Sequence, residues 1–376
     1  MMHTTSSKKV GLEFSDNKVR FISLQQERRG LVPHAYAEIV IPEQCIREGK
    51  IVDEKRFTIF LKELRKKYLI TSAFVALPDN ATRLLSGLVD MVASKGDTKD
   101  GTKELLQNNT SFDAQSATYE KKLVLYTKKG RYIQILAAST PVVEQYLRCF
   151  VEAGITPLSF EHPLQAHVSA ILPRGSTGSF LVVITRGYQT HVCVVVNEYV
   201  VDVLTLDEGV RTDTEQYPVS VATAINQYYI DWHSNKTYQG IIEPVTTLYI
   251  SGVAALKEEY VDYLSRTLKL SIVVGNTWTN CFSFENIIPR ITREQSFLYA
   301  SVVGLALGKD GASVLPRRHK KYLKRKKYFY RTGALLLSFV VGLLAGLIVV
   351  AALFFAEVIP QVPLLHKIAS WWVQIN

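Results

Sequence analysis

Residues 8–41, KKVGLEFSDNKVRFISLQQERRGLVPHAYAEIVI, hold three strand-like runs in succession and set the pattern for the rest of the chain. The runs cover residues 8–14, 18–24 and 31–41. Asp16 and Asn17, which separate the first two runs, have the short polar side chains that favour a tight turn. We therefore expect a β-hairpin followed by a third strand.

A helix, a strand and a second helix follow this opening. Residues 53–68 have apolar side chains at helical spacing, acidic residues in the first turn and basic residues in the last, which predicts an amphipathic helix. Residues 72–77 are apolar and end at Pro78, as in a buried strand. Further along, Thr140 is predicted to cap a helix that ends just before Gly154.

The same order of elements returns in the second half of the chain. Strands are predicted at residues 179–185, 190–196 and 199–206, then a helix at 219–232, a strand at 246–251 and a helix at 254–268. Residues 79–138 interrupt only the first copy, and their two strands around Lys128-Lys129-Gly130 predict a small inserted subdomain with a hairpin. A helix over residues 292–307 is expected to close the folded part.

Residues 333–356 carry no charged side chain and predict a transmembrane helix. As a helix they would extend over about 36 Å, more than the roughly 30 Å of a bilayer core. Basic residues crowd residues 311–332, the predicted juxtamembrane linker, whereas Lys367 stands alone on the other side, so the positive-inside rule assigns the N-terminal part to the cytoplasm. The side chains expected to contact anionic lipid headgroups are Arg317, Arg318, Lys320, Lys321, Lys324, Arg325, Lys326, Lys327 and Arg331.

This basic run accounts for most of the formal net charge of +10, so the remaining chain is nearly neutral and no nucleic-acid partner is expected. The four cysteines form no C-x-x-C pair and the eight histidines are scattered, which argues against a disulfide framework and a metal site. The chain also has no G-x-x-x-x-G-K-[ST] phosphate loop and no G-x-S-x-G nucleophile elbow.

Small residues repeat every four positions in the predicted transmembrane helix, at Ser338, Gly342 and Gly346. This spacing lets two helix backbones approach closely and predicts a homo-oligomer. Residues 357–376 have apolar side chains on one side from Pro363 onward, and we expect a short external amphipathic tail.

The duplicated β-β-β-α-β-α unit resembles the superfamily of actin, Hsp70 and the sugar kinases, whose two halves clasp a nucleotide. An insertion in the first half alone resembles the cell-division protein FtsA and the type IV pilus assembly protein PilM. The strings that point to PilM are VGLEFS at 10–15, EGKIVD at 48–53, VALP at 75–78, AGITP at 153–157 and ASVVGLALG at 300–308. The resemblance implies an α/β fold: a duplicated actin-like (ribonuclease H-like) domain over residues 8–78 and 139–310, with residues 79–138 inserted.

Val314-Leu315-Pro316, the basic run and the predicted transmembrane helix together resemble the opening of PilN, the membrane partner of PilM, and the equivalent part of the secretion protein GspL. The chain thus resembles a PilM-type domain fused to a PilN-type anchor. It departs from PilN and GspL after Ala356, where about 20 residues follow in place of a folded external region.

In this superfamily an Asp-x-Gly turn opens each half, because the Asp orients a metal-bound water and the Gly lets backbone N–H groups approach phosphate. The first turn here lacks the glycine, the second lacks the acid, and the adenosine loop replaces its first glycine by serine. We therefore expect little or no ATP turnover, and no cofactor beyond weakly bound ATP with Mg. The candidate cleft residues are Glu13, Ser15, Lys18, Thr185, Gly187, Ser251 and Gly252.

The resemblance implies a single-pass scaffold in the bacterial inner membrane, in the assembly platform of a type IV pilus or a type II secretion-like machine. Its expected partners are PilN-like and PilO-like membrane subunits and the cytoplasmic motor ATPase. In PilM a groove beside the insertion captures the tip of PilN, and the resemblance implies such a groove here. Two occupants stay open: a separate PilN-like subunit, or another partner, because the chain's own anchor is already attached. The chain's own linker is too basic and too close to the membrane to be the expected ligand. The alternatives are a membrane-tethered actin-like ATPase or sugar kinase, and an FtsA-like cytoskeletal anchor.

Overall fold

The computed structural model describes most of the chain, in segments separated by short gaps. These segments are residues 8–89, 101–109, 114–186, 189–207, 219–234, 242–283, 287, 290–308, 311–325, 341–349 and 351–352. The chain divides into two units, residues 1–316 and residues 317–376, and each is described by itself.

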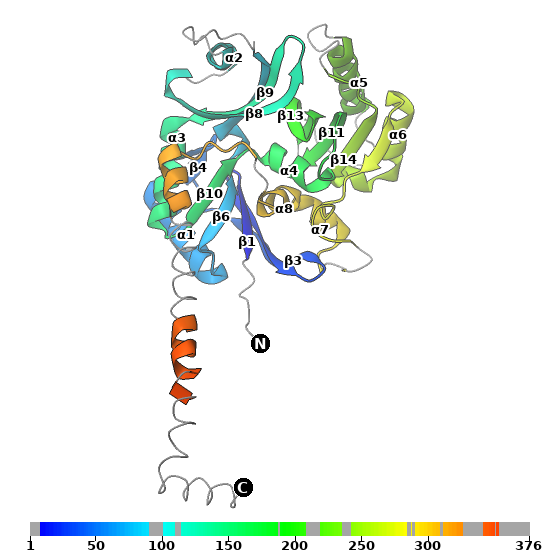
Figure 1. Cartoon of the computed structure of the whole chain (residues 1–376). Helices are drawn as coiled ribbons and strands as arrows, with labels where there is room; N and C mark the ends of the chain where they lie inside the picture. Colours follow the sequence, from blue (N-terminus) through cyan, green and yellow to red (C-terminus); the bar gives the residue numbers. More distant parts are fainter. Residues whose placement is uncertain are drawn as a thin grey trace, which may run out of the picture. The chain divides into compact units, whose positions relative to one another are not determined.

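The first sheet of the larger unit has the strand order β10-β6-β1-β2-β3 (Figure 1). β1, β2 and β3 are antiparallel neighbours, whereas β6 and β10 run parallel to β1, so the predicted hairpin and third strand are confirmed. The helices α1 and α3 pack on each other beside this sheet. The bounds are β1 Lys9–Phe14, β2 Lys18–Glu27, β3 Gly30–Val40, α1 Glu54–Tyr68, β6 Ser72–Ala76, α3 Thr140–Glu152 and β10 Thr156–Glu161, with a minor hairpin of β4 Ile46–Arg47 and β5 Lys50–Ile51.

The second sheet repeats this topology, with the order β13-β12-β11-β14-β15. β11, β12 and β13 are antiparallel neighbours, and β14 and β15 run parallel to β11. The two sheets therefore correspond strand for strand, which confirms the predicted duplication. The bounds are β11 Ser179–Arg186, β12 Gln189–Val196, β13 Tyr199–Leu206, α5 Val219–Ser234, β14 Thr247–Gly252, α6 Glu258–Leu268 and β15 Ser271–Val274.

The insertion forms a third sheet, of strand order β7-β9-β8, rather than a hairpin alone. Two of its strands match the prediction, but β7 was missed because its apolar residues do not alternate with polar ones. Ser86 of β7 donates a hydrogen bond of 2.5 Å to the carbonyl of Val201 in the second half, so tertiary contacts hold this strand in place. The bounds are β7 Thr82–Val89, α2 Gly101–Asn109, β8 Ala117–Thr127 and β9 Gly130–Ser139.

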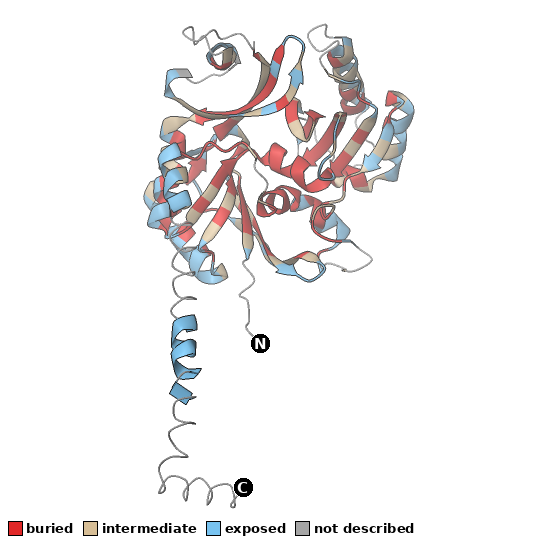
Figure 2. Ribbon diagram, in the orientation of Figure 1, coloured by how far each residue is buried: buried red, intermediate tan, exposed pale blue. Residues whose placement is uncertain are grey.

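Two short helices, α4 (Pro163–Ile171) and α8 (Ala300–Ala306), lie between the two sheets. Every residue of both helices is buried, and one hydrophobic cluster joins them to strands of both halves (Figure 2). A Cβ on Gly304 of α8 would lie 1.7 Å from the carbonyl oxygen of Ala166 in α4, so the two backbones touch. Glycine at this position thus sets the distance between the two helices.

Several predicted helix boundaries were wrong. The helix predicted over residues 292–307 is broken at Tyr299 into α7 (Arg293–Leu298) and α8, because Tyr299 leaves helical geometry at φ −102° and ψ 3°. The helix predicted from residue 254 begins as a 3-10 turn and becomes α6 only after Lys257, which is extended. The N-cap position of α3 is Ser139 rather than Thr140, and the Ser139 side chain makes no capping hydrogen bond, although Gly154 follows the end of the helix with φ +74° as expected.

The larger unit extends to Pro316, beyond the predicted domain end at residue 310. Residues 312–316 are buried, and the N–H of Val314 donates a hydrogen bond of 2.9 Å to the carbonyl of Phe160 in β10. The first part of the predicted linker is therefore a packed segment of the folded unit.

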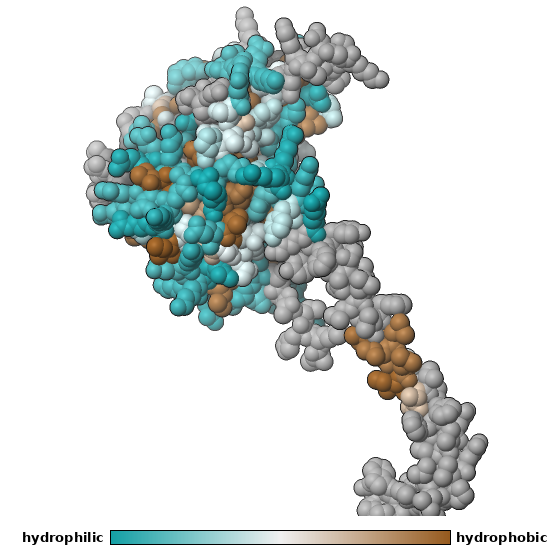
Figure 3. All heavy atoms as spheres, turned by 90° about the vertical axis from the view of Figure 1, so that its left-hand side faces the viewer, coloured by the Kyte–Doolittle hydropathy of each residue, from teal (hydrophilic) through white to brown (hydrophobic). Residues whose placement is uncertain are grey.

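In the smaller unit, residues 317–325, 341–349 and 351–352 are helical. Residues 341–349 are exposed and apolar throughout and form the continuous brown segment of Figure 3. Within the described residues, no helix combines the length and the hydropathy needed to cross a bilayer. Gly342 and Gly346 have open space around them. Several parts of the sequence-based predictions lie outside the described residues. These are the basic residues Lys326, Lys327 and Arg331, residues 333–340 with Ser338, residues 350 and 353–356, and the predicted tail at 357–376.

Candidate functional site

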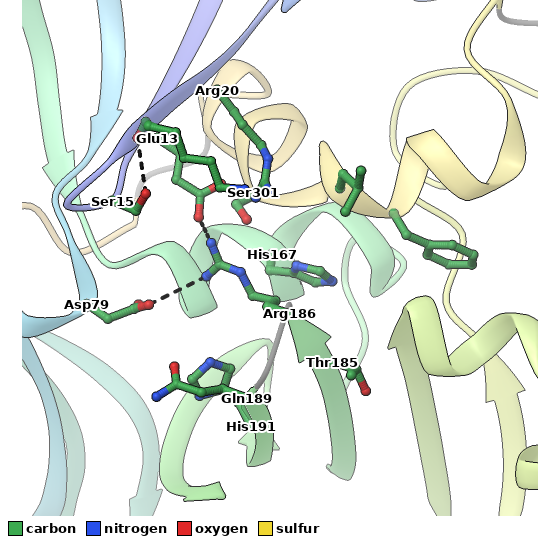
Figure 4. A pocket seen from close by; sticks show the side chains of 13 residues that line it. Glu13, Ser15, Arg20, Asp79, His167, Thr185, Arg186, Gln189, His191 and Ser301 are labelled. Atoms are coloured by element: carbon green, nitrogen blue, oxygen red, sulfur yellow. Dashed lines mark hydrogen bonds and ion pairs between the residues drawn. The ribbon is translucent and has the colours of Figure 1, made fainter. Parts of the chain in front are cut away.

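A cavity of about 180 Å³ lies between the two halves, beside the carboxyl ends of β1 and β11 (Figure 4). Residues from the helices α4, α7 and α8 complete its wall. Its lining residues are Glu13, Ser15, Lys18, Arg20, Asp79, His167, Thr185, Arg186, Gln189, His191, Phe297, Leu298 and Ser301.

Four of the candidate cleft residues line this cavity: Glu13, Ser15, Lys18 and Thr185. The strand registers explain why. Glu13 pairs with Ala76, the last residue of β6, and Thr185 pairs with Gly252, the last residue of β14, so Thr185 is the counterpart of Glu13 in the second half. The second half therefore has a threonine at the position equivalent to the acid of the first.

The other candidates lie behind the cavity wall or outside the described residues. Ser251 is buried, and its hydroxyl lies 2.8 Å from Nε2 of His167. Gly252 has φ +90°, and a Cβ there would lie 2.0 Å from the carbonyl oxygen of Thr185, so this position requires glycine for packing against β11. Gly187 is not among the described residues.

The main polar contact of the cavity is an ion pair between Arg186 and Glu13 that joins the two halves (Figure 4). Asp79 approaches the same guanidinium at 3.8 Å. The Glu13 side chain is 4% exposed and that of Arg186 is 19% exposed, so the pair is largely removed from water. Burial lowers the pKa of Arg186 to about 10, and the guanidinium therefore stays charged at neutral pH.

Sequence reasoning missed Arg186 and Asp79. Arg186 is the last residue of an otherwise uncharged strand, and Asp79 directly follows Pro78 after β6. A charged residue at the carboxyl end of a strand was the available signal, because such strand ends surround a cleft in sheets of this type. The pairing with Glu13 could not be read from the sequence, since it depends on how the halves meet.

Lys18 and Arg20, both on β2, also line the cavity, and both bind Glu38 of β3. The distances are 3.2 Å from Lys18 Nζ and 2.5 Å from Arg20 Nε to the carboxylate. Partial burial raises the pKa of Glu38, but the charges and hydrogen bonds of Arg20 and Lys18 outweigh it and hold this pKa below its usual value. Both cations are thus held by one acid of the neighbouring strand, and the three side chains together keep a charge of +1.

Three histidines of the larger unit are buried and uncharged at neutral pH, and two of them, His167 and His191, line the cavity. Burial lowers the pKa of His162 and of His167 to about 3 and that of His191 to about 4. Each has a hydrogen-bonding partner, such as Thr205, whose hydroxyl lies 3.0 Å from His191 Nδ1. Among the described residues, no three His, Cys, Asp or Glu side chains are grouped closely enough to hold a metal ion.

The residues present do not fit ATP with Mg as they are arranged. The carboxylate of Glu13, which would have to face a metal ion, is paired with Arg186. The N–H of Ser15, which would have to face phosphate, donates instead to the carbonyl of Lys18 at 2.9 Å within the β1–β2 turn. The cavity is also smaller than the roughly 300–1,000 Å³ of typical ligand pockets.

No protein-family model and no curated protein matches this chain. Solved structures do. A chain of the PilM-PilN type IV pilus biogenesis complex is 14% identical, with 83% of this chain and 99% of that chain covered and a TM-score of 0.61. This chain has an actin-like α/β fold. The cytoplasmic domain of EpsL, an inner membrane component of the type II secretion system of Vibrio cholerae, is 12% identical over 83% of this chain and all of that chain, with a TM-score of 0.46. MreB5 of Spiroplasma citri bound to ADP is 10% identical over 80% of this chain and 95% of that chain, with a TM-score of 0.41.

Proposed function

We propose that this chain is a scaffold in the inner-membrane assembly platform of a type IV pilus or a related type II secretion machine. Its folded unit couples the cytoplasmic motor ATPase to PilN-like and PilO-like membrane subunits, and residues 333–356 anchor it in the membrane as a single-pass protein. It acts as an adaptor and does not turn over ATP.

The observation that carries this proposal is the ion pair between Glu13 and Arg186. In an actin-like fold the acid of the first turn serves a metal-bound nucleotide, and here it serves a cation of the chain itself. The likeness of the fold to a chain of the PilM-PilN complex, over 99% of that chain, supports the choice of the pilus platform among the functions of this fold.

Capture of partners from native membranes tests the proposal. The tagged full chain is produced in its own cells, extracted in mild detergent and purified, and the proteins that accompany it are quantified by mass spectrometry. We expect enrichment of PilN-like and PilO-like subunits and of the motor ATPase over an untagged strain. Enrichment of cell-division or other filament-forming proteins in their place would instead support the cytoskeletal anchor.

A matched variant separates the scaffold from an ATPase that uses the cleft. Lys18 lines the cavity, but it is partly exposed and its ammonium group is paired with Glu38, so Lys18→Ala should fold normally. A scaffold keeps its captured partners and its pilus or secretion output in this variant. Loss of both in a stably folded Lys18→Ala protein would contradict the proposal.

A further inference from the structure

The first sheet has a basic surface at the end that lies away from the cavity. β1 and β6 are parallel and β2 is antiparallel to β1, so the start of β1, the β2–β3 turn and the start of β6 lie together, at the lower edge of the larger unit in Figure 1. α1 ends three residues before β6 begins and brings its last turn to the same edge. This edge carries seven basic residues, here called the basic end: Lys8, Lys9, Arg28, Arg29, Arg65, Lys66 and Lys67.

The charge of the basic end is not balanced by neighbouring acids. Each of its residues except Lys9 is exposed. Among the described residues, none of the seven forms an ion pair. Two acids lie at the same edge, Glu27 at the end of β2 and Glu152 at the end of α3, and Glu152 is bound to Lys62 at 3.2 Å. Because the chain outside its basic run is nearly neutral as a whole, this positive charge distinguishes one end of the fold from the rest of its surface.

An exposed leucine accompanies these cations. Leu69, which follows the last turn of α1, is 80% exposed. Its backbone is left-handed at φ +56°, a conformation for which glycine is the usual residue at a helix end. Neither burial nor backbone geometry therefore accounts for a leucine at this position. Basic side chains around an exposed aliphatic residue are the combination that binds the headgroup region of anionic bilayers.

We propose that the basic end is a membrane-contact surface of the folded unit, where the cations bind anionic lipid headgroups and Leu69 enters the headgroup layer. The inference goes beyond the proposed scaffold role, from which it takes only the presence of a membrane. It also differs from the expected contact of the basic run at residues 317–331, because the basic end belongs to the folded unit itself. An acidic protein is the other class of partner that such a charge fits, but the exposed Leu69 favours the bilayer.

The linker is long enough for this contact. The folded unit ends at Pro316, and Val314, two residues earlier, is bound to Phe160 at the carboxyl end of β10. The six residues of β10, which lead from there to the basic end, extend over about 20 Å. Residues 317–332 would extend over about 24 Å even as a helix. The cavity lies beside the carboxyl end of β1 and faces away from the bilayer in this arrangement.

Energy transfer from a dye on the folded unit to acceptors on lipid headgroups tests the contact. The full chain is incorporated into bilayer discs of phosphatidylcholine alone or mixed equally with phosphatidylglycerol. The dye is attached to a cysteine introduced at Thr71, an exposed residue of the same edge, or at Tyr126, which is 70% exposed near the β8–β9 turn at the top of Figure 1. The four native cysteines are buried, so labelling of the folded chain is confined to the introduced site.

We expect transfer from Thr71 in the phosphatidylglycerol discs to be at least twofold higher than transfer from Tyr126, and to fall to the Tyr126 value in phosphatidylcholine alone. Equal transfer from the two positions in the phosphatidylglycerol discs would overturn the inference. So would transfer from Thr71 that does not depend on the lipid, and that result would favour an acidic protein as the partner.

A matched pair of charge reversals separates this surface from the total charge of the chain. Arg28→Glu with Arg29→Glu changes an exposed hairpin turn of the basic end, and Lys128→Glu with Lys129→Glu makes the same change of charge in the exposed β8–β9 turn. Each basic contact with an anionic surface is worth about a fivefold change in binding. The first double variant should therefore lower transfer from Thr71 at least twofold, whereas the second should leave it unchanged. Equal effects of the two variants would contradict the assignment.

Leu69→Gly tests the aliphatic contact apart from the charges. Glycine suits the left-handed backbone, so this variant should melt at the same temperature as the parent chain or higher. Its transfer from Thr71 should nevertheless be lower, because no aliphatic side chain enters the headgroup layer. Unchanged transfer in this variant would overturn the role of Leu69.

Discussion

Arg186 and Glu13 form a largely buried ion pair, and removal of either side chain leaves the charge of the other without its partner. Removing one partner of a buried pair typically costs about 3–5 kcal/mol, whereas replacing both by neutral groups of similar size is often nearly neutral. We expect Arg186→Met to lower the free energy of unfolding by about 3 kcal/mol, because Glu13 then stays buried without its cation. Urea unfolding of the full chain measures this change.

The double variant Glu13→Gln with Arg186→Met provides the control. It removes both charges, so it should be more stable than Arg186→Met alone by about 2 kcal/mol. If the two single changes simply add in the double variant, the pair makes no specific contribution and the account of the cleft is wrong at this point.

His167 should make the stability of the folded unit depend on pH. Its pKa is about 3 in the folded state and near 6.5 when unfolded, so the unfolded chain binds the proton between these values and stability falls as the pH drops below about 6.5. This ring alone should remove about 2 kcal/mol between pH 7 and pH 5. In His167→Gln the loss of stability over this range should be smaller by that amount, as measured by urea unfolding at both pH values. An identical pH dependence in the two proteins would mean that the ring is solvated or charged.

The sequence predicted the candidate site in part. Glu13, Ser15 and Lys18 could be found because they lie at the turn between β1 and β2, which the local sequence pattern predicts. Arg186 and Asp79 could not be found in this way, because their role depends on their contact with each other, and they lie more than 100 residues apart in the sequence. The buried histidines likewise look unremarkable in the sequence, since burial and not composition shifts their pKa.

At the scale of helices and strands, the contact of α4 with α8 leaves no room for an added methyl group at Gly304. Gly304→Ala places a methyl group 1.7 Å from a backbone oxygen that cannot move without shifting α4. We expect the free energy of unfolding to fall by at least about 3 kcal/mol, which is at or beyond the upper end of the usual cost of overpacking a core. Gly101→Ala in α2 is the control, because its Cβ would meet Val89 at an ordinary 3.7 Å and should change stability by less than about 1 kcal/mol. Thermal unfolding distinguishes them, and equal melting temperatures would refute the close packing.

Elements with a strong local pattern were predicted well. α1 matches because its apolar spacing and its cap both lie in the local sequence, and the carboxylate of Asp53 accepts a hydrogen bond from the N–H of Arg56 at 2.9 Å. β7 was missed because a contact with a distant segment holds it in place. The break at Tyr299, whose ring packs against Tyr36, was missed because the apolar spacing continues through it. Residues 311–316 were interpreted as linker for the same reason, since their burial depends on contacts with β10 and β8.

At the scale of the whole molecule, the anchor remains a sequence-based prediction with a direct test. Residues 333–356 should cross the inner membrane once, with the N-terminus in the cytoplasm, because the basic run lies on one side only. A membrane-impermeant thiol reagent applied to intact cells should label a cysteine introduced at Gln374 and spare one introduced at Ser6. Both sites should react once the membrane is permeabilised, and the reverse labelling in intact cells would contradict the topology.

We propose that an actin-like fold serves here as a scaffold because its cleft is filled by its own ion pair. Calorimetric titration of the purified full chain with Mg-ATP, alongside a phosphate-release assay, can contradict this proposal. We predict no saturable heat and no phosphate release above the protein-free blank. Saturable binding together with a turnover that disappears in Glu13→Gln would show a working ATPase and contradict the account.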